Sequence, residues 1–299
     1  MQFRKAWRQV DGVLLLDKPL GLTSNDALQK ARRLFSAAKG GHTGTLDPLA
    51  TGLLPLCFGE ATKFSADLLD ADKTYEAVIK LGVATDSGDA EGVVIATAPV
   101  DVSECDIFRV LPQFSGAIRQ VPPMHSALKR NGRPLYELAR QGVVVEREPR
   151  AVTIHAIDCL SFFDDSLTLR VACSKGTYIR VLAADIGRLL GCGAHLAALR
   201  RTGVGDLDLR SAVTLAQLEA LDEAERAGLL QPVDALLHSL PELTLDGEAA
   251  QRFRHGNPVA LPAGLGGKIR VYVDRRLIGV GELAPDGRLW PRRLVQLAD

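Results

Sequence analysis

Residues 40–52 read GGHTGTLDPLATG, a short stretch in which four glycines flank a single carboxylate, Asp47. The proline that follows, Pro48, biases Asp47 away from the helical region and towards an extended backbone. Glycines on both sides allow a ligand to approach the backbone closely. The stretch therefore predicts an aspartate held in a fixed pose on a loop that accommodates a large partner. Taken alone, an Asp-Pro dipeptide also favours the simpler role of capping a turn.

The same stretch lacks the common phosphate- and metal-binding patterns. The P-loop pattern G-x-x-x-x-G-K-S/T is absent, and the glycine spacing differs from that of a dinucleotide-binding fingerprint. His42 and Asp47 are two possible metal ligands, but no H-E-x-x-H pattern accompanies them. Cys192 and His195 are close together in GCGAH and also lack further ligands. We therefore expect no metal site.

The composition is that of a globular enzyme. The chain has 299 residues, of which 46% are hydrophobic and 24% charged, and its formal net charge is zero. Its five cysteines are an odd number without C-x-x-C, which argues against a disulfide framework. The first twelve residues lack the apolar core of a signal peptide, and no apolar run approaches the ~20 residues of a membrane span. We expect a cytoplasmic protein that is not bound to a membrane.

Charge is distributed unevenly along the chain. Residues 67–106 carry ten acidic and two basic side chains, a balance of −8. Residues 119–150 carry seven basic and three acidic side chains, and residues 247–299 carry nine and five, a balance of +4 in each case. Each segment alone is more simply a solvated surface. Together they allow a neutral protein to present basic faces to nucleic acid, with the acidic segment turned away.

Local patterns predict an alternation of strands and helices. An apolar run at 12–16 predicts a buried strand, and Thr23 or Ser24 is a suitable N-cap for a helix that ends near Phe35. Residues 39–52 predict a loop. Further strands are expected at 75–81, 151–163, 166–180 and in a strand-turn-strand module at 268–297, and helices near 60–73, 106–114, 181–191, 212–230 and 245–256.

Several blocks resemble, in chain order, the motifs of the TruB family of pseudouridine synthases, which modify the T-loop uridine of tRNA. The block around Asp47 and the hexapeptide KGTYIR are the most specific to that family. The match covers nearly the whole chain. The matching blocks are GVLLLDKPLGLTSN, GGHTGTLDPLATGLLPLCFGEATKFS, DKTYEAVIKLGVATDSGDAEG, VPPMHSALKRNGRPLYELARQG, CSKGTYIRVLAADIG and GCGAHLAALRRTGVG.

The resemblance also implies a fold. It implies an α+β catalytic domain over residues 1–243, with a large, mainly antiparallel sheet flanked by helices. A segment at about 119–150 resembles the family's RNA-gripping thumb. Residues 244–299 resemble a PUA domain, a small β-rich RNA-binding barrel, on the block HGNPV…GELAPDGRLWPRRLV.

Three residues take catalytic roles in the resemblance. It implies that Asp47 is the nucleophile, that Arg180 pairs with Asp47, and that Tyr75 stacks on the flipped uracil and removes the proton at C5. The sequence leaves open whether Asp47 attacks C6, attacks C1′ or removes a sugar proton. Without the resemblance, Tyr75 is more simply a core residue of an alternating strand, and Arg180 a surface residue at a helix start.

Other residues are implied as substrate-binding. The resemblance places Tyr178 and Leu199 in the wall of the pocket and His42 as a wedge in the RNA loop. Lys18 would position the N-terminal loop and Lys63 would contact a phosphate, although either lysine is equally a solvated charge. Contacts to the phosphates of the RNA backbone are expected from the basic side chains Lys129, Arg130, Arg133 and Arg140.

The function implied is the isomerisation of the T-loop uridine, position 55 of tRNA, to pseudouridine by an enzyme without a cofactor. We expect the T-arm of tRNA as partner, no obligate protein partner and a monomer. Two alternatives stay open: a relative that depends on a guide RNA, and an RNA-binding protein that acts as a tRNA-folding chaperone.

Overall fold

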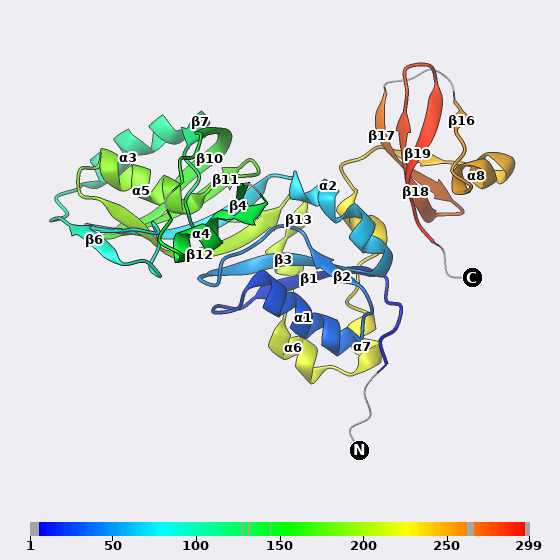
Figure 1. Ribbon diagram of the computed structural model, residues 1–299, viewed down its shortest axis with the longest axis horizontal. Coiled ribbons are helices and arrows are strands. Elements are labelled where there is room, and N and C mark those ends of the chain that lie inside the picture. The colour runs from blue at the N-terminus through cyan, green and yellow to red at the C-terminus, as the bar shows by residue number, and fades with distance from the viewer. Residues whose placement is uncertain (1–5, 127, 131, 144, 262–265, 297–299) are drawn as a thin grey trace.

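The computed structural model describes residues 6–126, 128–130, 132–143, 145–261 and 266–296. These residues form a ten-stranded sheet and a separate five-stranded sheet at the C-terminal end. Figure 1 shows helices packed around the larger sheet, with the smaller sheet at one end of an elongated molecule. The α+β class, with a large sheet and a small C-terminal β module, is therefore confirmed.

The large sheet is mainly antiparallel, and only the β1–β14 and β12–β3 pairs are parallel. Its strands, in spatial order, are β14 (Val213–Thr214), β1 (Gly12–Lys18), β3 (Ala50–Phe58), β12 (Ala194–Val204), β4 (Lys73–Leu81), β11 (Ser166–Cys173), β10 (Arg150–Phe163) and β7 (Gly116–Gln120). Two short strands join at its side, β2 (Gly40–His42) on β3 and β13 (Leu207–Asp208) on β12.

Eight α-helices are formed by the described residues; most surround the large sheet, whereas α8 packs on the C-terminal sheet, and there are two small hairpins. The helices are α1 (Ser24–Phe35), α2 (Ser65–Leu69), α3 (Glu104–Val110), α4 (Leu135–Arg140), α5 (Ile179–Leu189), α6 (Leu215–Ala220), α7 (Glu223–Ala227) and α8 (Gly247–Arg254). The hairpins are β5 (Val83–Thr85) with β6 (Val94–Thr97), and β8 (Lys129–Arg130) with β9 (Arg133–Pro134). Short 3₁₀ helices lie at Gly59–Phe64, Leu111–Phe114, Leu209–Ser211 and Val233–Leu236.

The best sequence predictions rest on short-range signals. The hydroxyl of Thr23 accepts the backbone N–H of Asp26, and the carboxylate of Asp26 accepts the N–H of Thr23, so a capping box starts α1 as expected. Along β4, Ala77, Ile79 and Leu81 are all buried, which confirms the alternation of this strand. The sheet therefore presents one apolar face to the helices.

Five local predictions were wrong. The helix expected near 60–73 is a 3₁₀ helix followed by the short α2, which ends at Leu69. The strand-turn-strand module expected over 268–297 has three strands instead of two. The helix expected over 212–230 is two short helices, because Asp222 caps the start of α7 with its own capping box to Glu225. The strand expected over 166–180 ends at Cys173, and the chain turns at Gly176, with φ of 79°, before α5 begins. The loop expected over 39–52 includes β2 and the first residues of β3.

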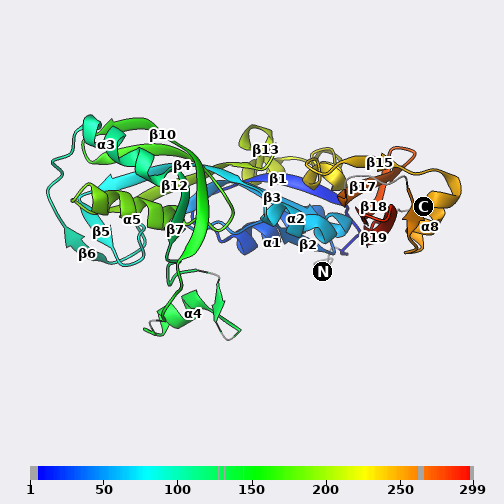
Figure 2. The same ribbon diagram turned by 90° about the horizontal axis from the view of Figure 1, so that it is seen from above.

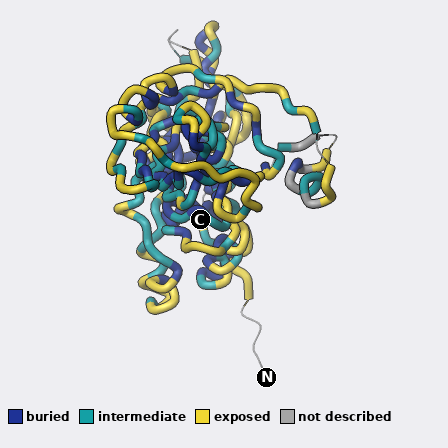
Figure 3. Tube along the Cα trace, turned by 90° about the vertical axis from the view of Figure 1, so that its left-hand side faces the viewer, coloured by how far each residue is buried: buried dark blue, intermediate teal, exposed yellow. Residues whose placement is uncertain are grey.

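An excursion from the sheet corresponds to the predicted thumb. Gln120, at the end of β7, pairs with Arg150, at the start of β10, so residues 121–149 leave the sheet and return to the same edge. Figures 2 and 3 show the part that carries α4 standing away from the body of the molecule. A segment with this shape presents its surface to a partner rather than to the core.

The C-terminal sheet has the strand order β15 (Glu242–Thr244), β17 (Gly267–Val273), β18 (Arg276–Leu283), β19 (Arg288–Leu294), β16 (Val259–Ala260). Tyr272 and Leu277 of this sheet pack in one apolar cluster with Leu53 of the large sheet. Lys63 donates to the carbonyl of Leu294 at 2.9 Å. Lys63 therefore ties the two sheets together. The division at residues 243 and 244 stays a prediction.

All five cysteines are free thiols. Within the described part of the chain, no helix has the length and apolar character needed to traverse a lipid bilayer.

Candidate active site

Asp47 lies on the loop between β2 and β3, and its neighbours in the chain are held on both sides. Ser24, the first residue of α1, donates its hydroxyl to the carbonyl of Leu46 at 3.1 Å and accepts the N–H of Leu46 at 2.7 Å. The N–H of Gly21 donates to the carbonyl of Pro48 at 2.9 Å. The side chain of Asp47 remains 47% exposed. The loop therefore fixes the backbone of Asp47 and leaves its carboxylate accessible.

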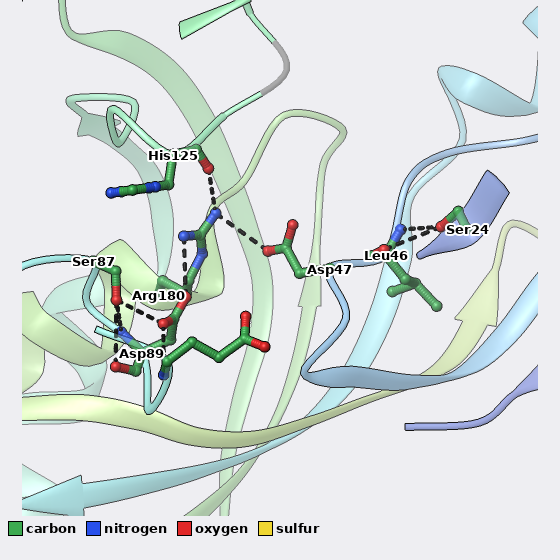
Figure 4. A network of polar contacts seen from close by, with 8 residues as sticks. Ser24, Leu46, Asp47, Ser87, Asp89, His125 and Arg180 are labelled. Atoms are coloured by element: carbon green, nitrogen blue, oxygen red, sulfur yellow. Dashed lines mark hydrogen bonds and ion pairs between the residues drawn. The ribbon is translucent and has the colours of Figure 1, made fainter. Parts of the chain in front are cut away.

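Arg180, the second residue of α5, lies between two carboxylates (Figure 4). Its Nη2 is 3.2 Å from Oδ2 of Asp47, and its Nη1 is 3.1 Å from Oδ2 of Asp89. Nη2 also donates to the carbonyl of His125 at 2.7 Å, at the base of the excursion. The guanidinium is 8% exposed. A buried guanidinium with this many partners orients the Asp47 carboxylate and keeps a positive charge beside it.

Asp89 is one of two site residues that the sequence did not predict. Its side chain is 4% exposed and accepts the hydroxyl of Ser87 at 2.6 Å and the N–H of Glu91 at 3.1 Å. It comes from the polar loop TDSGDAEG, in the acidic segment that was expected to face away from a nucleic acid. Ser and Gly around Asp89 indicate a turn, but no local signal in the sequence distinguishes a buried carboxylate from an exposed one.

Two hollows meet at Asp47 and Arg180. The first, of about 270 Å³, is lined by Asp47, Tyr75, Tyr178, Arg180, Leu199 and Arg201, among others. The second, of about 590 Å³, is lined by His42, Asp86, Ser87 and Glu91 and again by Asp47 and Arg180. The carboxylate of Asp47 therefore faces a small pocket with aromatic and aliphatic walls that opens beside a larger hollow with several acidic side chains in its lining.

Tyr75 and Arg201 occupy the floor of the smaller pocket. Tyr75 is on β4 and lies opposite Arg201 of β12 in the sheet, and both side chains line this pocket. Burial raises the pKa of the Tyr75 phenol, and the charge of Arg201 acts against that rise. Arg201 carried no prediction from the sequence, because nothing in the run LRRTG separates a buried arginine from an exposed one.

The pocket walls are positioned by the sheet and by the excursion. Leu199 lies on β12, two residues before Arg201, and pairs with Ala50 of β3. The side-chain amide of Gln120 accepts the N–H of Tyr178 at 3.0 Å and donates to its carbonyl at 3.3 Å. Tyr178 is therefore fixed by its backbone immediately before α5 begins.

His42 and Lys18 lie at the edge of the site. Burial, followed by the charge of Arg201, lowers the pKa of His42, which favours its neutral form. The ammonium of Lys18 is buried and donates to the carbonyls of Pro19 and Leu22, at 2.9 and 2.6 Å. Burial lowers the pKa of Lys18 to about 8, and the nearby Asp47 carboxylate acts in the opposite direction.

The remaining candidates are not brought to the pocket. Lys63 ion-pairs with Glu60 at 2.6 Å, where the two sheets meet. Arg133 is exposed and donates to the side chain of Gln141 at 3.2 Å. The side chains of Lys129, Arg130 and Arg140 lie outside the described residues.

No group of three or more metal-binding side chains occurs among the described residues. His195, which stands near Cys192 in the sequence, has its Nδ1 within 2.8 Å of the carbonyl of Val83.

Three family models match successive parts of the chain between residues 32 and 295. Residues 32–179 match the family described as TruB family pseudouridylate synthase, N terminal domain. Residues 180–238 match the tRNA pseudouridylate synthase B C-terminal domain, and residues 241–295 match the C-terminal part of pseudouridine synthase II TruB.

Individual proteins agree with this result. The chain is 78% identical over 299 residues to the curated tRNA pseudouridine synthase B of Dechloromonas aromatica, with 100% of both chains covered. It is 60% identical over 294 residues to the enzyme of the same name from Aromatoleum aromaticum, covering 98% of this chain and 96% of the relative.

Solved structures with the same architecture include complexes. An H/ACA RNP bound to a substrate RNA containing 2′-deoxyuridine has a TM-score of 0.73 at 25% identity, over 96% of this chain and 85% of the other. A Cbf5-Nop10-Gar1 complex has a TM-score of 0.71 at 28% identity, over 92% and 79%.

Proposed function

The chain belongs to the TruB family of pseudouridine synthases, and from this premise we propose that it isomerises the T-loop uridine at position 55 of tRNA to pseudouridine, with Asp47 as the nucleophile. The observation that carries the proposal is the pairing of Asp47 with Arg180 at the mouth of a pocket with aromatic walls. The curated relatives, named as tRNA enzymes, support tRNA as the substrate.

Each part of the site has a role in the proposed reaction. A uridine flipped out of the T-loop enters the smaller pocket, where Tyr75 stacks on the base and Tyr178 and Leu199 form its walls. Flipping costs a few kcal/mol, and stacking on a protein aromatic ring contributes about 1–3 kcal/mol per base. His42, at the edge of the larger hollow, holds the neighbouring RNA apart from the extruded base.

The Asp47 carboxylate reacts at the sugar or at C6 of the ring, and the N-glycosidic bond breaks. The base then turns and rejoins the sugar through C5. Arg180 holds the carboxylate in place during these steps, because its other nitrogen is anchored on the buried Asp89. A positioned nucleophile gains much of its rate from such orientation.

The proposal includes a protein that acts alone, as a cytoplasmic monomer, and that binds the T-arm with its excursion at 121–149 and its C-terminal sheet. Fold similarity to Cbf5 and H/ACA complexes supports a second candidate, a synthase that depends on a guide RNA and protein partners. The excursion favours the first candidate, since it supplies an RNA-facing surface within the chain itself.

The test is tritium release from unmodified tRNA transcripts that carry 5-³H-uridine, with no other protein or RNA added. Wild type is expected to release tritium, and Asp47→Asn is expected to release none above background. Asp101→Asn, at an exposed aspartate outside the pocket, is the matched control and is expected to behave as wild type. Mapping of the product identifies the modified nucleotide.

Absence of release by wild type, with tRNA binding intact, would overturn the self-sufficient enzyme and favour the guide-dependent or chaperone function. An Asp47→Asn protein that still refolds tRNA would show a chaperone activity that does not need catalysis.

A further inference from the structure

Arg201 lies at the centre of the site and is almost completely buried. It stands on β12, opposite Gly52 of β3 on one side and Tyr75 of β4 on the other. Its side chain is only 1% exposed. At Gly52, which has φ of 100°, an added Cβ would lie 2.2 Å from the carbonyl oxygen of Arg201. The strand that follows the Asp47 loop therefore approaches Arg201 as closely as two backbones can.

The guanidinium of Arg201 is held by uncharged groups. Its Nε donates to the carbonyl of Leu53 at 2.7 Å, and its Nη2 donates to the carbonyl of Gly44 at 3.3 Å, in the loop that carries Asp47. Tyr75 lies directly opposite Arg201 in the strand pair and lines the same pocket, so its phenol is exposed to the charge of the guanidinium. The ion pairs formed between described residues do not include Arg201, whereas the neighbouring Arg200 pairs with Asp17 at 2.6 Å.

An unpaired charge in a core is costly, and its effect on the neighbouring groups is visible. Burial, together with the positive charge of Arg201, lowers the pKa values of Lys18 and Lys73 to about 8. A methionine or leucine would fill the same volume without this cost. The position therefore tolerates an expensive side chain whose charge acts on the phenol and whose hydrogen bonds include one to the Asp47 loop, which indicates a use in the reaction.

We propose that Arg201 is a positioning residue that acts through Tyr75. It fixes the phenol oxygen towards the base and stabilises the phenolate, which accepts the C5 proton of the rejoined uracil. This inference rests on the proposed function, and it adds a residue to which neither the sequence analysis nor the comparisons assign a role.

The step balances without any further reactant. Once the sugar is joined to C5, the C5–H bond breaks and its proton moves to the phenolate oxygen of Tyr75. The C–H electron pair forms the C5–C6 double bond while the π pair of the C6–N1 double bond moves onto N1, the ring nitrogen that was released from the sugar, and N1 takes up a proton from water. The phenol later returns its proton to solvent. Arg201 stays protonated throughout, and the attraction between its guanidinium and Tyr75 is strongest when Tyr75 is a phenolate.

Other groups that face Tyr75 do not replace Arg201. Burial, Cys173 on β11 and the Asp47 carboxylate all raise the pKa of the phenol, and Arg201 is the group that opposes them. Lys18, Lys73 and His42 face Arg201 and are themselves driven towards their neutral forms. Loss of the guanidinium therefore leaves the phenolate without its stabilising partner.

The test is a double-mutant cycle on single-turnover tritium release at saturating enzyme. Arg201→Met and Tyr75→Phe are each expected to slow release about 10²-fold, the usual contribution of a positioned general base. In the Tyr75→Phe background, Arg201→Met is expected to cause almost no further loss, because its target is already gone. The dissociation constant for tRNA is expected to stay within about twofold of wild type, since only the chemical step is changed.

A pH profile gives a second readout that a purely structural role would not change. If Arg201 stabilises the phenolate, Arg201→Met is expected to reach its maximal release rate at higher pH than wild type. Arg201→Lys keeps a positive charge and is expected to lie between the two. If Arg201→Met does not fold, Arg201→Lys replaces it in the cycle with Tyr75→Phe.

Arg226→Met is the matched control, because Arg226 also donates to two backbone carbonyls, those of Leu218 at 2.7 Å and Leu34 at 3.1 Å, outside the pocket. It is expected to release tritium as wild type does. If wild type is active, two outcomes would overturn this inference and leave the proposed function intact. One is a double variant whose loss of rate equals the product of the two single losses, and the other is an Arg201→Met protein with the wild-type rate. An inactive wild type would remove the proposed function itself.

Discussion

The two arginines that border the pocket are both buried, yet their charges are balanced in different ways. Arg180, on α5, lies between the carboxylates of Asp47 and Asp89 at 3.2 and 3.1 Å. Arg201, on β12, donates to backbone carbonyls and lies opposite Tyr75. One cation is compensated by two negative charges, and the other by dipoles alone.

The difference shows how one residue type serves two purposes within a single site. A guanidinium paired with carboxylates fixes their positions and contributes little free positive potential to its surroundings. A guanidinium held by carbonyls keeps its positive electrostatic potential. This potential adds to the effect of burial in lowering the pKa values of Lys18 and Lys73, and it also acts against the rise that burial causes in the pKa of the Tyr75 phenol. The first arrangement suits the orientation of Asp47, and the second suits the stabilisation of an anion that forms during the reaction.

The largest expected effect comes from removing Arg180, the arginine that is paired with two carboxylates. Arg180→Met leaves Asp89 buried without a counterion, so we expect a loss of about 3–5 kcal/mol in the free energy of unfolding, measured by urea denaturation. Because Asp47 also loses its anchor, we expect tritium release to fall at least about 10²-fold.

The matched control for Arg180→Met is Arg188→Met, on the same helix, whose ion pair with Asp185 involves an arginine that is 75% exposed. Exposed pairs contribute about 1 kcal/mol or less, so this variant is expected to stay close to wild type in both measurements. Equal stability of the Arg180 and Arg188 variants would contradict the distinction between compensated and exposed pairs.

A smaller effect is expected from Asp89→Asn, which removes one of the two negative charges and keeps a similar side-chain shape. Arg180 then still pairs with Asp47 but loses the charged anchor on its other nitrogen. We expect roughly a tenfold decrease in the tritium-release rate, about 1.4 kcal/mol of transition-state stabilisation, with little change in tRNA binding. A wild-type rate would show that Asp47 is oriented by Arg180 without help from Asp89.

The smallest expected effect concerns Lys18, which lies near the uncompensated charge of Arg201, and it is a pH-dependent change in the free energy of unfolding. Burial lowers the pKa of Lys18 in the folded protein to about 8, from the usual lysine value of 10.5. Between these two values the unfolded chain binds a proton that the folded chain does not, so the free energy of unfolding rises as pH increases from about 8 to 10. Lys18→Met is expected to lose on the order of 1 kcal/mol of this rise, in urea denaturation at several pH values.

Lys30→Met, at an exposed lysine of α1, is the control and should keep the full rise. Lys73 carries the same shift and remains in both variants, so part of the rise persists. An unchanged pH dependence in Lys18→Met would show that Lys18 is solvated more fully than its burial suggests.

The features that could be predicted from the sequence are those formed by residues close together in the chain. The Thr23–Asp26 capping box and the alternation along β4 both depend on residues within a few positions of each other. The motif around Asp47 and KGTYIR identified the residues that the structure pairs, Asp47 with Arg180, through resemblance to the TruB family. Family membership and the α+β class followed from the same blocks.

Long-range contacts escaped prediction. The bond between Arg180 and Asp89 joins residues 91 positions apart, and the bond between Lys63 and Leu294 joins residues 231 positions apart. The break between α6 and α7 was missed for another reason: Asp222 was read as one more polar residue in a helix, whereas it is the N-cap of the next helix.

The sequence by itself determined the family, the fold class and the identity of the carboxylate at the centre of the site, because those depend on local patterns and on motifs that are contiguous in the chain. Only the tertiary structure decided which of the many charged residues are buried and with whom. Asp89 and Arg201 look like ordinary surface residues in the sequence, and they differ only because the crossing of strands and loops removes water from each and supplies a guanidinium or backbone carbonyls in its place.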